Sequence, residues 1–142
     1  MPKADCYLGF DFGTKKIGCA VGQSLTRSAT PLKKIPVRQS EIRWELIQQY
    51  IKEWQPSALV VGLPLNMDGT EQNITQLAKQ FAKDLEKRYQ LSVYLVDERL
   101  STRDARERVF EMGGYKALQN TDIDSLAAKL ILEMWLQDNE NL

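Results

Sequence analysis

The stretch GFDFGTKKIGCAVG, residues 9–22, decides the expected fold. It predicts a strand ending at Asp11, a turn at Gly13 and Thr14, and a second strand antiparallel to the first. Because side chains alternate along a strand, Asp11 shares a face with Gly9. The second strand places only small residues on one of its faces: Gly18, Ala20 and Gly22. Such a face leaves room either for a phosphate backbone or for a closely packed helix, and this stretch alone leaves both alternatives open.

The composition indicates a globular protein rather than a membrane or fibrous one. The chain has 142 residues, of which 43% are hydrophobic and 27% are charged. This length suits one domain, so we expect residues 1–142 to form a single domain with a polar tail at about 138–142. We find neither an apolar run long enough to span a bilayer nor a signal peptide, and we therefore expect a cytoplasmic location without a membrane partner.

The chain contains no histidine and only two cysteines, Cys6 and Cys19. The lack of histidine excludes Ser-His-Asp triads, Cys-His pairs and a histidine general base, and it argues against a structural zinc site. On adjacent strands the two cysteines would lie about 13 Å apart, so we expect buried thiols rather than a disulfide. If the chain is a hydrolase, carboxylates with a hard metal ion are the most economical route left to it.

The formal net charge is zero, but positive charge is concentrated near the start of the chain. Residues 1–38 contain seven Lys or Arg and two acidic residues, which gives this part a net charge of +5. Such a distribution fits local phosphate contacts, although solvated strand faces are the ordinary explanation for it.

Hydrophobic periodicity and helix-capping signals predict the element order β-β-β-α-β-α-β-α-α. After the first two strands we expect a strand at 30–37, a helix from Ser40 to Gln55, a strand at 58–62, a helix from Thr70, a strand at 91–96, and helices from Ser101 toward Met112 and from Thr121. The fold class is therefore α/β. We expect a five-stranded mixed sheet in which strands 1–3 form an antiparallel meander, strands 4 and 5 run parallel, and helices cover both faces. The first strand should lie centrally, beside residues 58–62.

Acidic residues follow the elements that end at one edge of this sheet. Asp11 ends the first strand, Asp97 and Glu98 end the last strand, and Asp122 and Asp124 lie in the first turn of the last helix. Ligand sites in parallel α/β sheets collect at the carboxyl ends of strands. In a chain without histidine, these acids together indicate a divalent metal site.

Each of these acids also has a structural explanation. Asp124 could close a capping box with Thr121, where the helix dipole favours negative charge. Asp97 or Glu98 could pair with neighbouring arginines on the surface. Asp11 is harder to explain in this way, because aspartate is disfavoured within strands.

Four stretches resemble, in order, the signature blocks of the YqgF (RuvX) family: DFGTKKIGCAVG, VVGLPLNMDGT, VDERLSTRDAR and DIDSLAAKLIL. The resemblance extends from Gly9 to about Leu136. It implies a ribonuclease H-like fold related to the RuvC Holliday-junction resolvases. It also implies a nuclease that matures the 5′ end of 16S ribosomal RNA from its precursor, with a Holliday-junction resolvase acting on four-way DNA as the alternative.

The resemblance implies that Asp11, Glu98 and Asp124 are catalytic residues that bind one or two Mg²⁺ or Mn²⁺ ions, with Asp97 as the alternative to Glu98. Many nucleases of the wider superfamily place an acid after the fourth strand, where this chain has GLP at 62–64. Here the acid follows the fifth strand, about 10 Å from the first. The longer side chain of Glu98 favours it over Asp97.

The reaction implied is metal-assisted hydrolysis of a phosphodiester bond that leaves a 5′-phosphate. The expected nucleic-acid contacts are Gly13, Thr14, Lys15, Arg99, Ser101, Thr102 and Arg103. With Asp11 as the central ligand, we interpret the face of small residues beside it as clearance for a nucleic-acid backbone. The expected partner is precursor 16S RNA or structured DNA.

Two other classes of protein compete with the nuclease. The D-x-G-T turn resembles the phosphate-binding hairpin of actin-like ATPases, but these bind nucleotide between two domains, so we expect no nucleotide cofactor here. A non-catalytic nucleic-acid binding module is the second rival, and three acids without metal would repel phosphate. A junction resolvase must make two symmetric cuts, which favours a homodimer, but the sequence leaves monomer and homodimer both open.

Overall fold

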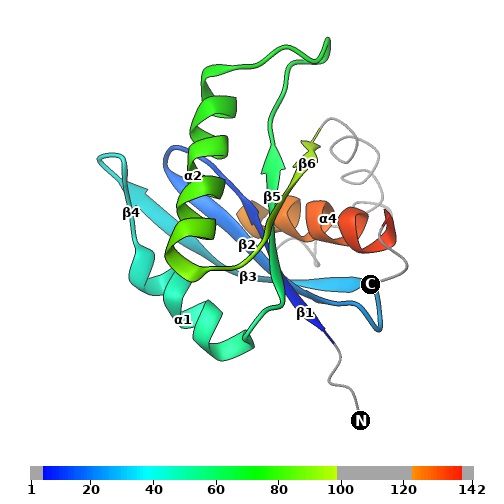
Figure 1. The fold of residues 1–142 in the computed structure, drawn as a ribbon. Helices are drawn as coiled ribbons and strands as arrows, with labels where there is room; N and C mark the ends of the chain where they lie inside the picture. Colours follow the sequence, from blue (N-terminus) through cyan, green and yellow to red (C-terminus); the bar gives the residue numbers. More distant parts are fainter. Residues whose placement is uncertain (1–4, 99–122, 139–142) are drawn as a thin grey trace.

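The computed structural model describes residues 5–98 and 123–138 (Figure 1). The elements in chain order are β1 (Cys6–Asp11), β2 (Lys16–Gln23), β3 (Ser28–Arg38), β4 (Glu41–Ile42), α1 (Trp44–Trp54), β5 (Ala58–Leu63), α2 (Asn73–Tyr89), β6 (Val93–Asp97) and α4 (Ile123–Asp138). The helix expected from Ser101 toward Met112 and the cap expected at Thr121 lie outside the described residues. None of the described helices is long and apolar enough to cross a membrane.

The strands form one mixed sheet in the order β4-β3-β2-β1-β5-β6. β1, β2 and β3 pair antiparallel, whereas β5 lies parallel to β1, and β6 lies parallel to β5. This confirms the predicted meander followed by two parallel strands, with the first strand in the centre beside residues 58–62. The two-residue strand β4 adds a sixth strand that the sequence pattern did not predict.

The helix predicted from Ser40 begins later, at Trp44. Gln39 and Ser40 have φ angles of 53° and 63°, and they join β3 to β4 as a two-residue hairpin. Two positive φ angles in succession are typical of a hairpin turn of type I′ and are incompatible with a right-handed helix. The prediction of Ser40 as a helix cap was therefore wrong.

The second helix also begins later than predicted, at Asn73 rather than directly after Thr70. Thr70 instead donates its amide to Asp68 Oδ1 at 2.9 Å, within the loop that precedes the helix. The Gln72 amide donates to Thr75 Oγ1 at 2.9 Å, and the Thr75 hydroxyl donates to the Pro64 carbonyl. Thr75 is fully buried, so this hydroxyl ties the start of α2 to the chain that leaves β5.

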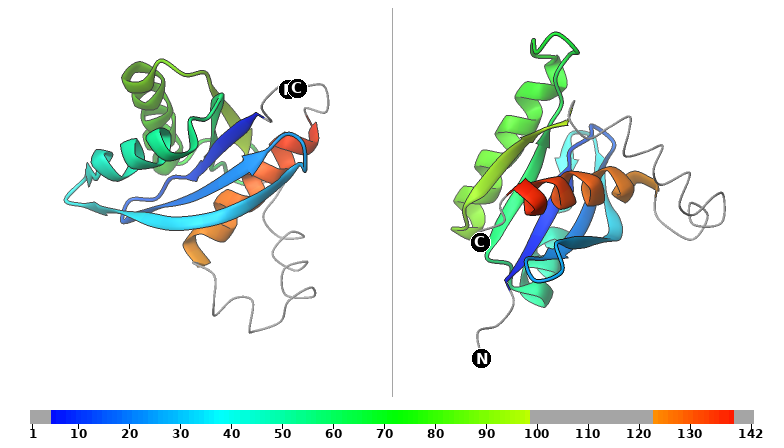
Figure 2. Two further views of the ribbon diagram at one scale, coloured as in Figure 1. Left: turned by 90° about the horizontal axis from the view of Figure 1, so that it is seen from below. Right: turned by 90° about the vertical axis from the view of Figure 1, so that its right-hand side faces the viewer.

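The helices cover both faces of the sheet, as Figure 2 shows, with α1 and α2 on one face and α4 on the other. On the first face, the rings of Phe10 and Phe12 pack against Phe81 of α2. Trp44 at the start of α1 also contacts Phe81, and the Arg88 guanidinium lies 4.0 Å from the centre of the Trp44 ring. These aromatic contacts join α1, α2 and β1 into the larger of two buried apolar clusters.

The face of small residues on β1 and β2 is covered by α4. A Cβ atom on Gly9 would lie 2.8 Å from Leu132 Cβ, and one on Gly22 would lie 2.9 Å from Leu136 Cδ1. Real Cβ atoms do not approach other atoms so closely, so the glycines let the helix lie directly on the sheet. The interpretation of this face as clearance for nucleic acid was wrong, and the closely packed helix is the correct alternative.

Neither cysteine forms a disulfide; Cys19 is buried and Cys6 is half-buried. Burial raises the pKa of the Cys6 thiol, which lowers its thiolate fraction at neutral pH.

We expect a thiol reagent to modify Cys6 slowly and Cys19 only after unfolding. Reaction of one thiol in buffer and two in denaturant would agree with this expectation, and rapid reaction of both in buffer would contradict it.

Candidate active site

Asp11 is the last residue of β1, in the middle of the sheet. Its partner across the β1–β2 ladder is Gly18. On the other side, Phe10 is paired with Val61 of β5, so one position further along these parallel strands Asp11 is level with Gly62. By strand alternation Asp11 projects from the same face as Gly9, which is the face that α4 covers.

The side chain of Glu98 lies over Gly62. A Cβ atom built on Gly62 would lie 2.5 Å from Glu98 Oε1 and 3.0 Å from Glu98 Cγ. The same Cβ would lie 2.5 Å from Ile131 Cδ1 of α4, and Glu98 Oε1 is buried. Glu98 therefore crosses the end of β5 on the α4 face, in space that exists only because residue 62 has no side chain. This brings its carboxylate to the face and edge of the sheet where Asp11 projects.

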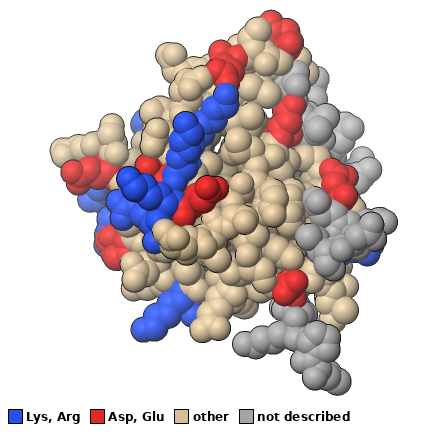
Figure 3. Space-filling view, viewed as in Figure 1, with Lys and Arg blue, Asp and Glu red and all other residues tan. Residues whose placement is uncertain are grey.

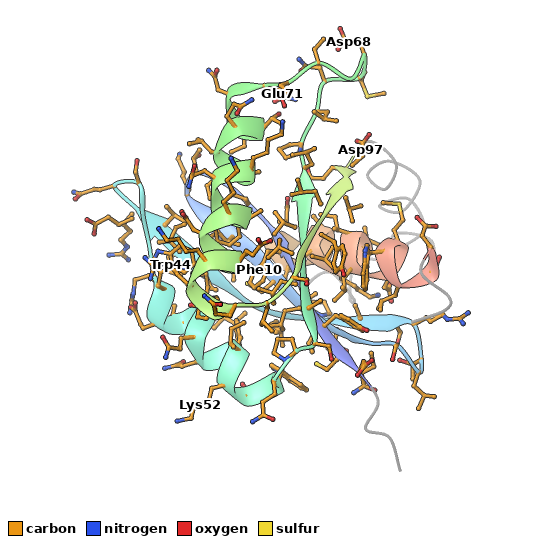
Figure 4. The ribbon with its side chains drawn as sticks, in the orientation of Figure 1. Phe10, Trp44, Lys52, Asp68, Glu71 and Asp97 are labelled. Carbon is orange, nitrogen blue, oxygen red and sulfur yellow. The ribbon has the colours of Figure 1, made fainter. Side chains whose placement is uncertain are left out.

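Asp97 ends β6 and is paired with Leu63 of β5. Its neighbour Val96 is buried against α4, so alternation directs Asp97 to the opposite face. Figure 4 shows Asp97 at the end of β6, away from α4. Of the two neighbouring acids, Glu98 is the one that lies on the face shared with Asp11.

Asp124 lies in the first turn of α4, immediately before Ser125, and its side chain is outside the described residues. Ser125 is fully buried. Its hydroxyl accepts a hydrogen bond from the Cys19 amide at 3.1 Å and donates one to the Leu32 carbonyl. The beginning of α4 is thus attached to β2 and β3 directly beside Gly18, the partner of Asp11.

Two of the three predicted ligands can be placed with their side chains, Asp11 and Glu98. Within residues 5–98 and the described part of α4, no group of three or more Asp, Glu, Cys or His side chains could hold a metal ion. The described part of the site consists of two carboxylates on one face, with the start of α4 beside them. Carboxylate oxygens are the ligands that Mg²⁺ and Mn²⁺ prefer.

The predicted phosphate contacts fall into two groups. Gly13, Thr14 and Lys15 form the turn between β1 and β2, next to Asp11, and the last two are exposed. A Cβ on Gly13 would lie 2.6 Å from the Lys16 carbonyl oxygen, so the tight turn requires glycine. The Val37 amide donates to the Lys15 carbonyl at 2.9 Å and holds the turn against β3. The second group, Arg99, Ser101, Thr102 and Arg103, lies outside the described residues.

Positive charge also gathers away from this edge. In Figure 3, Lys and Arg side chains form a band over α2, where Lys83, Lys87 and Arg88 are exposed. This band lies on the side of the sheet opposite α4. Beside Asp11 itself, the nearest described cation in sequence is Lys15 of the turn.

Comparison with known proteins identifies the family. The family model described as "RuvX: Holliday junction resolvase" matches residues 5–138, nearly the whole chain. The chain belongs to the RuvX family. Relatives in this family include a protein of Legionella pneumophila subsp. pneumophila (strain Philadelphia 1 / ATCC 33152 / DSM 7513), 52% identical over 140 residues, which covers 99% of this chain and 100% of the relative. A protein of Haemophilus influenzae (strain PittEE) is 51% identical over 133 residues, covering 94% and 96%. Both bear the name "Putative pre-16S rRNA nuclease".

The fold also resembles solved structures of other proteins. RuvC of T. thermophilus in complex with a Holliday junction substrate matches with a TM-score of 0.60 and 15% identity, over 96% of each chain. The fowlpox virus Holliday junction resolvase matches with a TM-score of 0.55 and 12% identity, over 94% of this chain and 98% of that one. These likenesses confirm the RuvC-type, ribonuclease H-like fold predicted from the sequence.

Sequence reasoning missed two residues that shape the candidate site of this RuvX family member, Gly62 and Ser125. The sequence pattern drew attention to Gly62 only because an acid is lacking there, whereas the structure shows that its missing side chain makes room for Glu98. Ser125 follows Asp124 directly, and a buried serine near a helix start gives no distinctive signal in one sequence. Both depend on contacts between elements distant in the chain.

Proposed function

We propose that this chain is a metal-dependent nuclease that hydrolyses phosphodiester bonds and acts on the 5′ end of precursor 16S ribosomal RNA. The observation that carries the proposal is the carboxylate of Glu98 lying over Gly62, on the face and edge where Asp11 projects. The assignment of this substrate is supported by the name that relatives with 51% and 52% sequence identity share. The proposal includes a cytoplasmic location, because ribosomal precursor RNA would be the substrate.

In this proposal Asp11, Glu98 and Asp124 hold one or two Mg²⁺ or Mn²⁺ ions. The fit rests on the donor set and on the space at Gly62, which a Cβ atom would fill. When bound, the metal supplies Lewis-acid stabilisation of the charge that develops on the phosphate oxygens. The carboxylates alone would repel the phosphates of the substrate, and a bound cation would offset this repulsion.

The turn between β1 and β2 orients the substrate in this proposal. Lys15 is exposed next to Asp11, so its ammonium can pair with a phosphate beside the scissile one. Thr14 offers a hydroxyl, and the backbone amides of the turn offer further donors. The hydrogen bond from the Val37 amide to the Lys15 carbonyl keeps these donors in place as the substrate binds. Arg99, Ser101, Thr102 and Arg103 would follow the nucleic-acid strand.

A second candidate function is resolution of four-way DNA junctions. It is favoured by the description of the family model and by the likeness of the fold to RuvC. A resolvase needs two symmetric cuts and therefore two copies of the chain. Sedimentation with and without a four-way junction would reveal a dimer that the ribonuclease proposal does not require.

One experiment separates the two substrates. The purified chain is incubated with Mn²⁺ in one buffer, with RNA spanning the 5′ end of precursor 16S RNA and, separately, with a four-way DNA junction. We expect cleavage of the RNA at discrete positions with 5′-phosphate ends, and the same chain with excess chelator serves as the control. Cleavage of the junction alone would overturn the RNA assignment. If neither substrate were cleaved, the proposal of nuclease activity would be contradicted.

A further inference from the structure

The hydroxyl of Ser125 joins two strands of the sheet to the helix that carries Asp124. It accepts from the Cys19 amide of β2 at 3.1 Å and donates to the Leu32 carbonyl of β3. Cys19 and Leu32 are partners across the β2–β3 ladder. A side chain from α4 thus satisfies a strand donor and a strand acceptor at the same time, and Ser125 itself has no exposed surface.

The ladder is irregular at this point. Ile17 is paired with Ile35 and Cys19 with Leu32, so β3 has one residue more than β2 between the two pairs. An extra residue disturbs the ladder locally and leaves backbone groups that need other partners. The Ser125 hydroxyl takes this role for the Cys19 amide and the Leu32 carbonyl.

The irregularity lies beside the end of β1. Gly18, which falls between the two pairs, is the partner of Asp11. The connection therefore runs from Asp11 to Gly18, to the adjoining Cys19, across the hydrogen bond to Ser125, and to Asp124 one residue before it. Each step is a covalent bond, a strand pairing or a hydrogen bond.

We propose that Ser125 is a positioning residue that sets the place of Asp124 relative to Asp11, and so determines the metal affinity of the site. The inference rests on the proposed function, because it assumes that these two acids share a metal ion. Loss of a partner hydrogen-bonded directly to a metal ligand typically weakens metal binding by about 10- to 100-fold, and because Ser125 acts through the backbone next to Asp124, we expect the lower end of that range.

A merely structural role for Ser125 predicts something different. In that case its loss would destabilise the fold and leave the metal affinity of the folded protein unchanged. Glu133 provides the matched control, since its Oε2 accepts the Ala29 amide of β3 at 3.0 Å. It also joins α4 to the sheet through a side-chain acceptor, but it lies about 12 Å further along the helix.

The experiment compares Mn²⁺ binding by isothermal titration calorimetry in the parent chain, Ser125→Ala, Ser125→Cys and Glu133→Ala. The rise in melting temperature with added Mn²⁺ is the second readout. We expect the dissociation constant to rise at least about tenfold in Ser125→Ala, and less in Ser125→Cys, which keeps a weak donor and acceptor. Glu133→Ala should stay within about twofold of the parent while losing thermal stability. If Ser125→Ala fails to fold, Ser125→Cys carries the comparison.

Unchanged Mn²⁺ affinity in both Ser125 variants, with binding by the parent, would overturn the inference and leave the proposed function intact. An equal loss of affinity in Glu133→Ala would also overturn it, because the effect would then follow general loosening of α4. If the parent chain bound no Mn²⁺, the proposed function would fail, and this inference with it.

Discussion

Replacement of Asp11 by asparagine is expected to lower Mn²⁺-dependent cleavage of precursor RNA by about a thousandfold while leaving the fold intact. Asparagine has the same shape as aspartate, so the strand end that pairs with Gly18 is undisturbed. What is lost is the negative charge at the centre of the sheet edge. The measurement is the single-turnover rate with saturating Mn²⁺, together with the melting temperature.

Asp5→Asn is the matched control for this substitution. Asp5 directly precedes β1, at the end opposite Asp11, and its Oδ1 accepts a hydrogen bond from the Ser57 hydroxyl at 3.2 Å. The two aspartates are about 20 Å apart along the strand, so the control removes one negative charge without touching the site. Equal cleavage rates for Asp11→Asn and the parent would refute the assignment of Asp11 as a metal ligand.

Replacement of Gly62 by alanine is expected to reduce the cleavage rate about a hundredfold. This loss is larger than the accompanying loss of folding stability would cause. The new Cβ would lie 2.5 Å from Glu98 Oε1 and 2.5 Å from Ile131 Cδ1. The Glu98 carboxylate is the end of a flexible side chain, so it can swing aside at small cost, but it then leaves the face shared with Asp11. Overpacking against α4 should cost about 1–3 kcal/mol in the free energy of unfolding.

A second substitution separates the two clashes. Ile131→Val removes the Cδ1 atom that the new Cβ would meet, at a cost of about 0.5–1.5 kcal/mol on its own. In the double variant Gly62→Ala/Ile131→Val the clash with Glu98 remains and the clash with α4 is relieved. Cleavage should stay low in this variant even though its denaturation midpoint recovers relative to Gly62→Ala. If cleavage recovered together with stability, the loss of activity in Gly62→Ala would come from the clash with α4 and not from displacement of Glu98.

Local patterns in the sequence predicted most of the fold. The alternation along residues 6–11, the apolar run at 58–62 and the turn at Gly13 are properties of neighbouring residues, so they are visible without knowledge of the partners. The order of elements then restricted the sheet, because right-handed crossovers after a meander leave few arrangements. The helix starts were less predictable. Ser40 and Thr70 are favourable N-cap residues in isolation. In the structure, however, Ser40 lies in a hairpin turn and Thr70 lies in the loop before α2.

The sequence by itself determined that Asp11 ends a central strand and that acids follow the last parallel strand. Only the tertiary structure decided the role of the small residues of β1 and β2. Leu132, more than a hundred residues away in the chain, packs so closely on Gly9 that a larger residue there would clash with it. It also decided that Glu98 rather than Asp97 faces α4, and that Gly62 makes the space for it. The physical reason is the same in each case. Alternation tells which residues share a face, but the packing of distant elements decides which face is covered and where a carboxylate can fit.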